Sequence, residues 1–503
     1  MADLDHHILA VVEPAILPTE IKLDNLGEDG GGAKQTKNIG SVKPFVLVNS
    51  YQFGPEDIES FDLVLSGVVP KCSLVLADNK NAFGVESYPR DGDFFTILLN
   101  SKQQETFKSV HMDFDIASVE VAPATEGVTP TITLEGVCKV PRLYAEDCQT
   151  LESGSSLDHL ELIARDLELG VATNIDSTND SQSRIQAFVT YSDFIKSIVE
   201  DSYISDDAFT VYHIDQWYYV NYVDINKIFN SKNPKLDELM TVLNSFGASM
   251  VEGAEAEEGG ENKGDNIETP LLLTNHKDMK GLNNYVEGHE MINNSASVSL
   301  AAGYSRTVQI YDNNSEPGER FQDFKIEALT TEELSDIEEP LRGNRKDTRH
   351  EDQVKYKYIG RQNAGEDGLG NTHANAAFSK LHNKQNQMEI QKMKVKLTLA
   401  SFNPSIYKYM KIPLLMYHYD GPKIEAQAIG NKKREDAGFS ERPFGAGRSE
   451  DTDNQPSQSL DQFLSGHYII ENIDYTYAKG TSGIRQEVTL IRREWPTRIK
   501  NLE

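Results

Sequence analysis

The sequence predicts an α+β fold that is mainly β, with two antiparallel β-domains on either side of an inserted α/β domain. Three observations support this prediction. Short β-forming runs separated by turn residues fill positions 42–140. A capped amphipathic helix and a hairpin follow at 185–225, and strict alternation of apolar and polar residues returns at 393–399. Polar loop insertions interrupt the second β-domain.

Length and composition set the class of protein. The chain has 503 residues, of which 38% are hydrophobic and 25% are charged. This suffices for two to four domains with cores of their own and is typical of a soluble globular protein with some disordered stretches. No apolar run approaches the roughly 20 residues that a membrane span needs. The first residues, MADLDHHILAVVEPA, carry acids where a secretory signal carries bases, so we expect no membrane insertion.

The charge and the cysteine content argue against three further classes of protein. The formal net charge is −30, from 79 acidic and 49 basic residues. Such a surface repels phosphates, which argues against a protein that binds nucleic acid by neutralising them, but it suits a surface past which DNA moves without being held. Cys72, Cys138 and Cys148 are an odd number without CxxC spacing. They indicate reduced thiols, not a disulfide framework or a zinc site.

The first third of the chain divides into an arm and a β-domain. Positions 1–40 form an N-terminal arm with one apolar stretch at 8–17 and a glycine-rich stretch at 27–32. The first β-domain is predicted at 41–145. About six strands in roughly 100 residues, with almost no helical pattern, favour an antiparallel barrel or sandwich. The predicted strands are 45–48, 61–65, 73–76, 94–99, 110–121 and 132–140.

The inserted α/β domain is predicted at 146–235 and contains two helices before its hairpin. Ser155–Ser156 caps the first helix, and Gly170 is placed to end it. Thr190 or Ser192 caps the second. The apolar positions that share one helical face are Leu157, Leu160, Ile163, Ala164 and Leu167 in the first helix, and Phe194, Ile195, Ile198 and Val199 in the second. The hairpin strands are 209–214 and 217–223, joined by Asp215–Gln216.

The rest of the chain is a linker and a broken β-domain. Positions 236–268 form an acidic linker, with seven carboxylates among glycines from 252 onward, and flexibility argues against an ion site there. The second β-domain is predicted at 269–315 and 386–503, interrupted by a polar insertion at 316–385. A second polar excursion spans 421–461. The last β pair is 467–477 and 484–492.

Candidate chemical motifs are incomplete. His289–Glu290 begins like a zincin helix, but the run HEMIN lacks the second histidine. His6–His7 has no carboxylate or thiol pattern around it, and Asp91 with Asp93 is typical of turn chemistry. No P-loop, GxSxG elbow or strand-associated GxGxxG occurs. We therefore predict no catalytic, cofactor-binding or metal-binding residues and no enzymatic activity.

One aromatic cluster leaves two interpretations open. Its members are Tyr212, Trp217, Tyr218, Tyr219 and Tyr222. The first interpretation is a stacking platform for sugars or bases. The second is packing or a protein interface, which two-sided aromatic strands more often serve.

Four segments together resemble a known family. They are Asp91-Gly92-Asp93-Phe94-Phe95-Thr96-Ile97, the strand Ile132 to Val140, the helix Leu157 to Leu169 followed by Phe188 through Tyr222, and the pair formed by Gly466 to Ile473 and Val488-Thr489-Leu490. In this order they resemble the central baseplate hub of contractile-tailed phages of the T-even type. That family is related to late control protein D and to the VgrG hub base of type VI secretion. The resemblance spans most of 40–495.

The resemblance implies a structural role and a set of partners. The two β-domains would be tail-tube-like barrels, and the chain would form a homotrimer that presents six barrels to the hexameric tail tube and three-fold symmetry to the central spike. Further implied partners are the tape-measure protein and baseplate wedge proteins, with DNA passing through the channel without specific binding. The expected location is the virion tail baseplate, assembled in the host cytoplasm.

Two alternatives remain open at this point. The first is a hub that also degrades cell wall, although the polar excursions are too polar to form a lysozyme-like core. The second is the spike-base component of a type VI-like contractile injection system. That version usually continues into an OB domain and a β-prism, and this sequence shows no such repeats before Glu503.

Overall fold

The computed structural model describes the chain in segments that form two compact units. The described residues are 7–21, 42–49, 51–78, 83, 88–90, 92–100, 109–122, 130–231, 238–241, 243, 271–280, 282–294, 305–311, 321–327, 355–356, 373, 375–403, 405–419, 458–461, 463–481 and 483–492. The first unit comprises 1–233, 281–412 and 467–503, and the second comprises 234–280 and 413–466.

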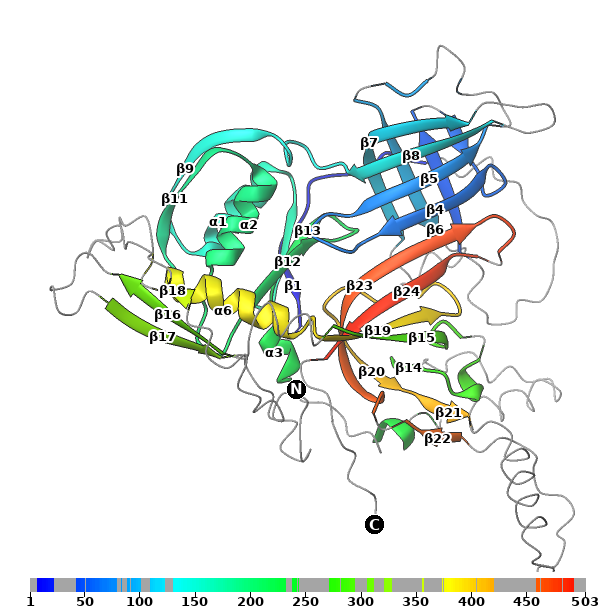
Figure 1. The fold of residues 1–503 in the computed structure, drawn as a ribbon. Helices are drawn as coiled ribbons and strands as arrows, with labels where there is room; N and C mark the ends of the chain where they lie inside the picture. The colour runs from blue at the N-terminus through cyan, green and yellow to red at the C-terminus, as the bar shows by residue number, and fades with distance from the viewer. Residues whose placement is uncertain are drawn as a thin grey trace, which may run out of the picture. The chain divides into compact units, whose positions relative to one another are not determined.

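A long antiparallel sheet dominates the first unit (Figure 1). Eleven strands follow one another in the order β15-β19-β24-β23-β4-β5-β8-β7-β6-β2-β3, and the mainly β prediction is confirmed. Their bounds are β2 Lys43–Val48, β3 Tyr51–Phe53, β4 Ile58–Val64, β5 Lys71–Ala77, β6 Phe94–Asn100, β7 Val110–Ala122, β8 Thr131–Cys138, β15 Val286–Asn293, β19 Met393–Leu399, β23 Gly466–Ala478 and β24 Arg485–Ile491.

One strand pair joins the two β-domains into this sheet. Residues Asp474–Ala478 of β23 pair antiparallel with Ser60–Val64 of β4. Beyond the ladder, the Leu65 N–H donates to the Ile473 carbonyl at 3.1 Å. Because a strand edge with unpaired N–H and C=O groups is unstable in isolation, each β-domain completes the edge of the other.

Close packing holds the first β-domain together around a strand glycine. The rings of Phe95 and Phe114 stack with centroids 5.3 Å apart. A Cβ built on Gly136 of β8 would lie 2.5 Å from a carbon of the Phe95 ring and 2.8 Å from Cβ of Phe114. Only glycine leaves room for both rings, which explains why this residue interrupts a β-branched run.

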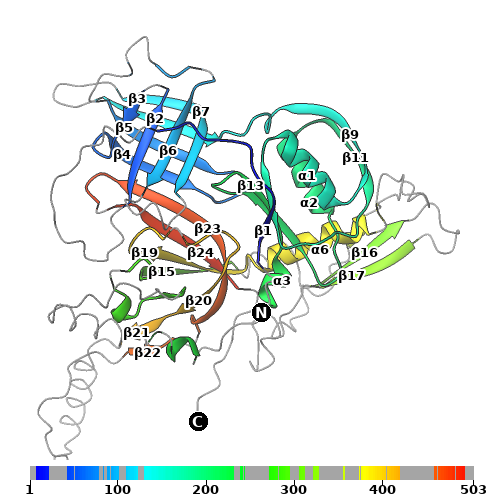
Figure 2. The ribbon, with the colours of Figure 1, turned by 180° about the vertical axis from the view of Figure 1, so that it is seen from behind.

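The inserted α/β domain has a small mixed sheet covered by helices (Figure 2). Its strand order is β1-β10-β13-β12, in which β10 and β13 run parallel and the outer pairs run antiparallel. Strand β1 comes from the predicted N-terminal arm, which therefore contributes an edge to this sheet. The elements are β1 Leu9–Val12, α1 Ser156–Asp166, β10 Gly170–Thr173, α2 Tyr191–Asp201, β12 Thr210–Ile214, β13 Tyr219–Asp224 and α3 Ile225–Phe229.

A separate two-stranded ribbon curves around the outside of α1 and α2 (Figure 1). It consists of β9 (Glu146–Gly154) and β11 (Gln182–Thr190), which pair antiparallel with two register shifts. The polar side of β11 faces the helices, because Arg184 contacts both His159 and Ser156 of α1 at 2.9 Å.

Helix α6 (Ala376–Glu389) docks on the insert through polar side chains. Ser379, His382, Asn383 and Gln387 donate to backbone carbonyls in the segment 201–210, at 2.9, 2.9, 3.0 and 2.7 Å. These contacts satisfy carbonyl groups of the connection between α2 and β12 that no regular element pairs.

A small three-stranded sheet precedes α6 in the chain. Its order is β17-β16-β18, with β16 Ser305–Tyr311, β17 Phe321–Glu327 and β18 Lys355–Tyr356. Together with α6, it shows that the predicted polar insertion at 316–385 contains regular structure and is not all loop.

The second unit is built from short elements. Strand β14 (Leu273–Thr274) pairs in parallel with Leu414 and Leu415 of β20 (Lys411–Leu415), and β21 (Tyr417–Tyr419) pairs antiparallel with β22 (Gln458–Leu460). The 3-10 helix η1 spans Lys277–Met279. Most of the predicted acidic linker, 236–268, and most of the excursion 421–461 lie outside the described residues.

Most predicted elements of the insert are confirmed, with corrected ends. Ser155 is the N-cap of α1 and forms a capping box with Asp158. Thr190, not Ser192, caps α2. The hairpin turn is wider than predicted, because Asp215 accepts from the N–H groups of Trp217 and Tyr219 at 2.8 and 3.0 Å and delays the second strand until Tyr219.

We predict that Gly136→Ala lowers the free energy of unfolding by about 1–3 kcal/mol, because the added methyl group displaces Phe95 and Phe114. Urea titration followed by fluorescence measures this change in the free energy of unfolding. Gly288→Ala is the matched control, since Gly288 also lies in a strand and its nearest neighbour atom would be 4.0 Å away. Equal losses in both variants would contradict the packing argument.

Candidate functional site

A cleft of about 630 Å³ opens within the first unit, between the inserted domain and the second β-domain. Helices α2 and α6, strands β12, β15, β19, β23 and β24, and three connecting segments contribute to it. Its lining residues are Ser66, Gly67, Val68, Lys196, Val199, Glu200, Val211, Tyr212, Ile292, Gln387, Ile390, Gln391, Lys394, Lys408, Tyr409, Glu471, Asn472, Thr489 and Ile491.

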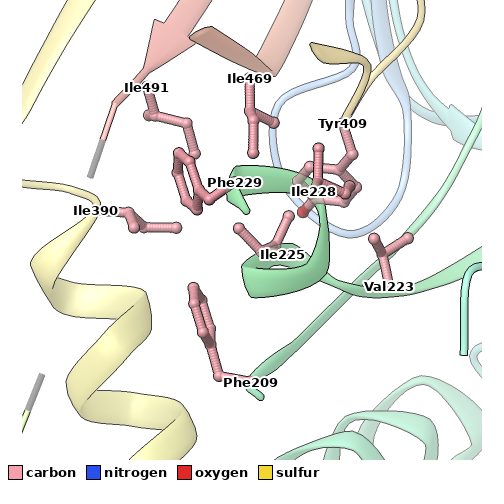
Figure 3. Packing of buried hydrophobic residues seen from close by; sticks show 9 residues of the cluster. All are labelled: Phe209, Val223, Ile225, Ile228, Phe229, Ile390, Tyr409, Ile469 and Ile491. Carbon is pink, nitrogen blue, oxygen red and sulfur yellow. The ribbon is translucent and has the colours of Figure 1, made fainter. Parts of the chain in front are cut away.

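Part of the apolar lining belongs to a hydrophobic cluster that joins the insert to the second β-domain (Figure 3). Ile390, Tyr409 and Ile491 belong both to the cleft and to this cluster. The other buried members are Phe209, Val223, Ile225, Ile228, Phe229 and Ile469. The floor of the cleft is therefore fixed by packing that also sets the position of the insert.

A buried ammonium group lies in the wall of the cleft. Lys408 is 6% exposed, and its Nζ donates to the carbonyl oxygens of Leu65 and Gly67 at 3.2 and 2.9 Å. Burial lowers its pKa to about 8, against the opposing field of Glu471 and Asp474. Among the described residues no carboxylate lies within ion-pair distance of it.

A second lysine in the cleft is neutralised. The Lys394 Nζ lies 2.7 Å from Glu471 Oε2 and donates to Oε1 at 2.9 Å. Gln391 donates to the same carboxylate. The Glu471 carboxylate of β23 thus links Lys394 of β19 with Gln391, which lies just beyond the end of α6.

A buried histidine lies behind Tyr409. His213 of β12 is 2% exposed, and its ring meets Tyr409 edge to face with centroids 4.9 Å apart. Burial, together with the charge of Lys408, lowers the pKa of His213 well below its ordinary value. Burial also raises the pKa of Tyr409 and of Tyr212. These groups are neutral at pH 7 and serve packing.

The lining of the cleft combines apolar and charged side chains. They are an apolar floor, the Lys394–Glu471 ion pair, the Lys408 ammonium, and the further charged residues Lys196 and Glu200; the lining contains no histidine or cysteine. Over the described part of the chain, no group of three His, Cys, Asp or Glu residues is arranged to hold a metal ion. Among the described helices, none combines the length and apolar character required to cross a membrane.

The sequence motifs fall elsewhere and carry structural roles. His289 and Glu290 lie in β15, so the HEMIN run is a strand and not a zincin helix. Asp93 closes a turn by accepting from the Arg90 N–H at 2.6 Å and from Asn49 at 3.1 Å, whereas Asp91 and His6 lie outside the described residues. Cys72 and Cys138 are buried free thiols, and Cys148 is an exposed one.

The aromatic cluster of the hairpin serves packing. Tyr218 and Tyr222 are buried, at 2% and 0% exposure. The Tyr218 hydroxyl accepts from the Asp113 N–H at 2.8 Å and so ties the insert to β7, while the Tyr219 hydroxyl donates to Glu13 next to β1. Tyr218 and Tyr222 are therefore closed to a stacking ligand, and the packing interpretation is confirmed for these two; Tyr212, Trp217 and Tyr219 are half-buried.

Sequence reasoning missed the residues that form the cleft. Lys408 carries no local motif, and its contacts lie more than 340 positions away in the chain. Gln387 and Gln391 belong to a polar stretch without hydrophobic periodicity. The alternation at 393–399, which places Lys394 and Lys396 on one face of β19, was the one usable signal.

We predict that Lys408 makes stability rise with alkaline pH. Its folded pKa of about 8 lies below the unfolded value of 10.5, so the unfolded chain binds more protons between these values and the unfolding free energy rises with pH across that window. Between pH 7.5 and 9.5, the unfolding free energy of the wild type should rise by about 2 kcal/mol more than that of Lys408→Met.

Denaturant titrations at five pH values measure this difference. Lys479→Met is the control, because Lys479 pairs with Glu59 at the surface and its pKa is raised, which gives no such gain. A flat difference between wild type and Lys408→Met would contradict a charged, buried Lys408.

Comparisons with known proteins give structural likeness only. No protein-family model matches the chain, and no curated protein sequence matches it. The fold is similar to a tail protein from Neisseria meningitidis MC58, with TM-score 0.45, 8% identity, and coverage of 90% of this chain and 97% of that one. It is also similar to the 43 kDa tail protein of prophage MuSo2 from Shewanella oneidensis, with TM-score 0.46, 8% identity, and coverage of 90% and 99%.

A further similar structure is the E. coli c3393 protein, a component of the type VI secretion system, with TM-score 0.40, 8% identity, and coverage of 89% and 76%. TM-scores below 0.5 and identities below 10% establish neither a family nor an activity.

Proposed function

We propose that the chain is the structural baseplate hub of a contractile phage tail. It would form a trimeric adaptor that joins the hexameric tail tube to the three-fold central spike and lines the DNA channel, with no catalytic site of its own. The proposal rests on the sequence resemblance spanning 40–495. It also rests on the order of the parts along the chain: β-domain, α/β insert and second β-domain.

The pairing of β23 with β4 is the observation that carries this proposal. It fuses two β-domains of one chain into a single sheet with a fixed register over Asp474–Ala478 and Ser60–Val64. Three such chains around a three-fold axis would present six β-domains at one end. A rigid join within each chain is what a change from six-fold to three-fold symmetry requires, since a hinge there would let the ring distort.

Open sheet edges give a means of assembly. Within the described residues, β15 pairs only with β19, and β15 stands at the end of the strand order. Most of its side chains are exposed, including Met291. An edge strand of eight residues is a ready template for a neighbouring chain, and closure into a ring would satisfy it.

The charge of the chain suits passage of DNA. A net charge of −30 repels phosphates, so DNA would move along an acidic channel without being held. This part of the proposal fails if the channel wall of the assembled protein is basic or neutral.

The native molar mass of the purified chain, measured by light scattering with and without the candidate spike protein, tests the proposal. We expect three chains of 56.3 kDa, either alone or once the spike is added. Imaging should then show a ring with six-fold-like features. A stable monomer that ignores the spike would overturn the hub proposal.

A pair of proline substitutions tests whether β15 is the assembling edge. Glu290 and Met291 are adjacent, so their N–H groups point to opposite sides of the strand, one toward β19 and one toward the open edge. One of Glu290→Pro and Met291→Pro should destabilise the sheet. The other should keep the circular dichroism spectrum and lose the trimer. If the variant that keeps its circular dichroism spectrum still forms trimers, β15 is not the interface.

A further inference from the structure

Strand β11 of the β9–β11 ribbon has its apolar side chains on the outside, whereas Leu151 of β9 is buried. Arg184 and Gln186, which face the helices, are 7% and 0% exposed, whereas Ile185 and Phe188 are 61% and 75% exposed. A ribbon that lies on helices ordinarily buries its apolar face and exposes its polar one. The order is reversed on β11, so packing within this chain does not explain its exposed Ile185 and Phe188.

Hydrogen bonds fix this register. The Arg184 guanidinium contacts His159 Nδ1 and donates to Ser156 Oγ, and Gln149 donates to Gln186 Oε1 at 2.7 Å. A slip by one residue would bring Ile185 to the inner face and expel Arg184. The inner face is built to hold polar groups, and the outer face therefore keeps its apolar ones.

Phe188 adds a strained backbone to the same face. It stands in the register shift between Ala187 and Val189 and has φ 52°, a region that bulky residues rarely adopt. Gln186 holds the bulge by donating to the Val189 carbonyl at 2.8 Å. An aromatic residue that is both strained and three-quarters exposed costs stability without contributing to the core, and such residues concentrate where a partner binds.

The surroundings of this face determine what can cover it. Glu146 and Glu152 of β9 are exposed toward opposite ends of the ribbon, about 20 Å apart along the strand. Cys148 and Thr150 lie directly across from Ala187 and Ile185. A second copy of the same face would bring carboxylates together in a chain that already carries −30. Charge complementarity therefore favours a basic partner.

We propose that the outer face of the ribbon, formed by Ile185, Ala187 and Phe188 between Glu146 and Glu152, docks a segment of another protein. That segment presents apolar side chains between two basic residues about 20 Å apart. Apolar contact at the centre supplies the affinity, and the two ion pairs at the rim fix the orientation. This docking face is a property of the ribbon alone and does not depend on the hub proposal.

Cys148 is a natural reporter for this docking. It is the exposed thiol of the chain and lies in the middle of the face, whereas Cys72 and Cys138 are buried. The probe is a synthetic β-hairpin peptide with valines between two lysines six residues apart. Its matched control carries glutamates in place of the lysines. The measurement is the rate at which a maleimide alkylates Cys148 of the full chain.

We expect the lysine peptide to slow alkylation about fivefold or more at saturation, and the glutamate peptide to leave the rate unchanged. Ile185→Thr and Phe188→Asn should abolish the protection. Phe188→Asn should also raise Tm by about 1–3 °C, because asparagine tolerates the positive φ. Leu162→Gln is the control, since Leu162 is an exposed apolar residue of α1 outside the ribbon, and protection should persist.

Three results would overturn the proposal. They are equal protection by both peptides, no protection by the lysine peptide, and protection that grows with the concentration of the chain alone. The last result would identify a second copy as the occupant.

Discussion

The turn between β4 and β5 places a constraint on the first unit, because its backbone groups form hydrogen bonds with three other parts of the chain. Leu65 bonds to Ile473 of the second β-domain, the carbonyls of Leu65 and Gly67 hold Lys408, and the Val68 carbonyl accepts from Ile214 of the insert at 2.7 Å. Leu65 is buried, and a buried backbone group without a partner is costly, so its contacts with Ile473 and Lys408 keep these two segments in place. The positive φ of Gly67 lets the turn reach all of them.

Polar contacts help to attach α6 and the ribbon to the helices and sheet of the insert. His382, Asn383 and Gln387 bond to backbone carbonyls near the start of β12, and Arg184 bonds to α1. A polar interface of this kind gives directional specificity, since a wrong docking leaves buried groups unpaired. The apolar cluster around Phe229 then provides the less directional part of the packing.

The fold was predictable where the spacing of apolar residues along the chain marks the buried face of an element. The alternation at 393–399 and the spacing of Phe194 and Ile198 gave β19 and α2 directly. Helix α6 could not be predicted, because its buried side chains are polar and carry no hydrophobic period. The cleft could not be predicted either, since Lys408 gains its setting from residues more than 340 positions away.

The pairing of β23 with β4 also constrains how the chain is made. Lys479 meets Glu59 across 420 positions of sequence, so the two strands emerge from the ribosome far apart in time. During synthesis the edge of β4 stays open to other strands, and contacts of such high sequence separation form slowly. Nascent chains of this protein therefore pass through a long interval in which a neighbouring nascent chain, or a chaperone, competes for the place that β23 will occupy.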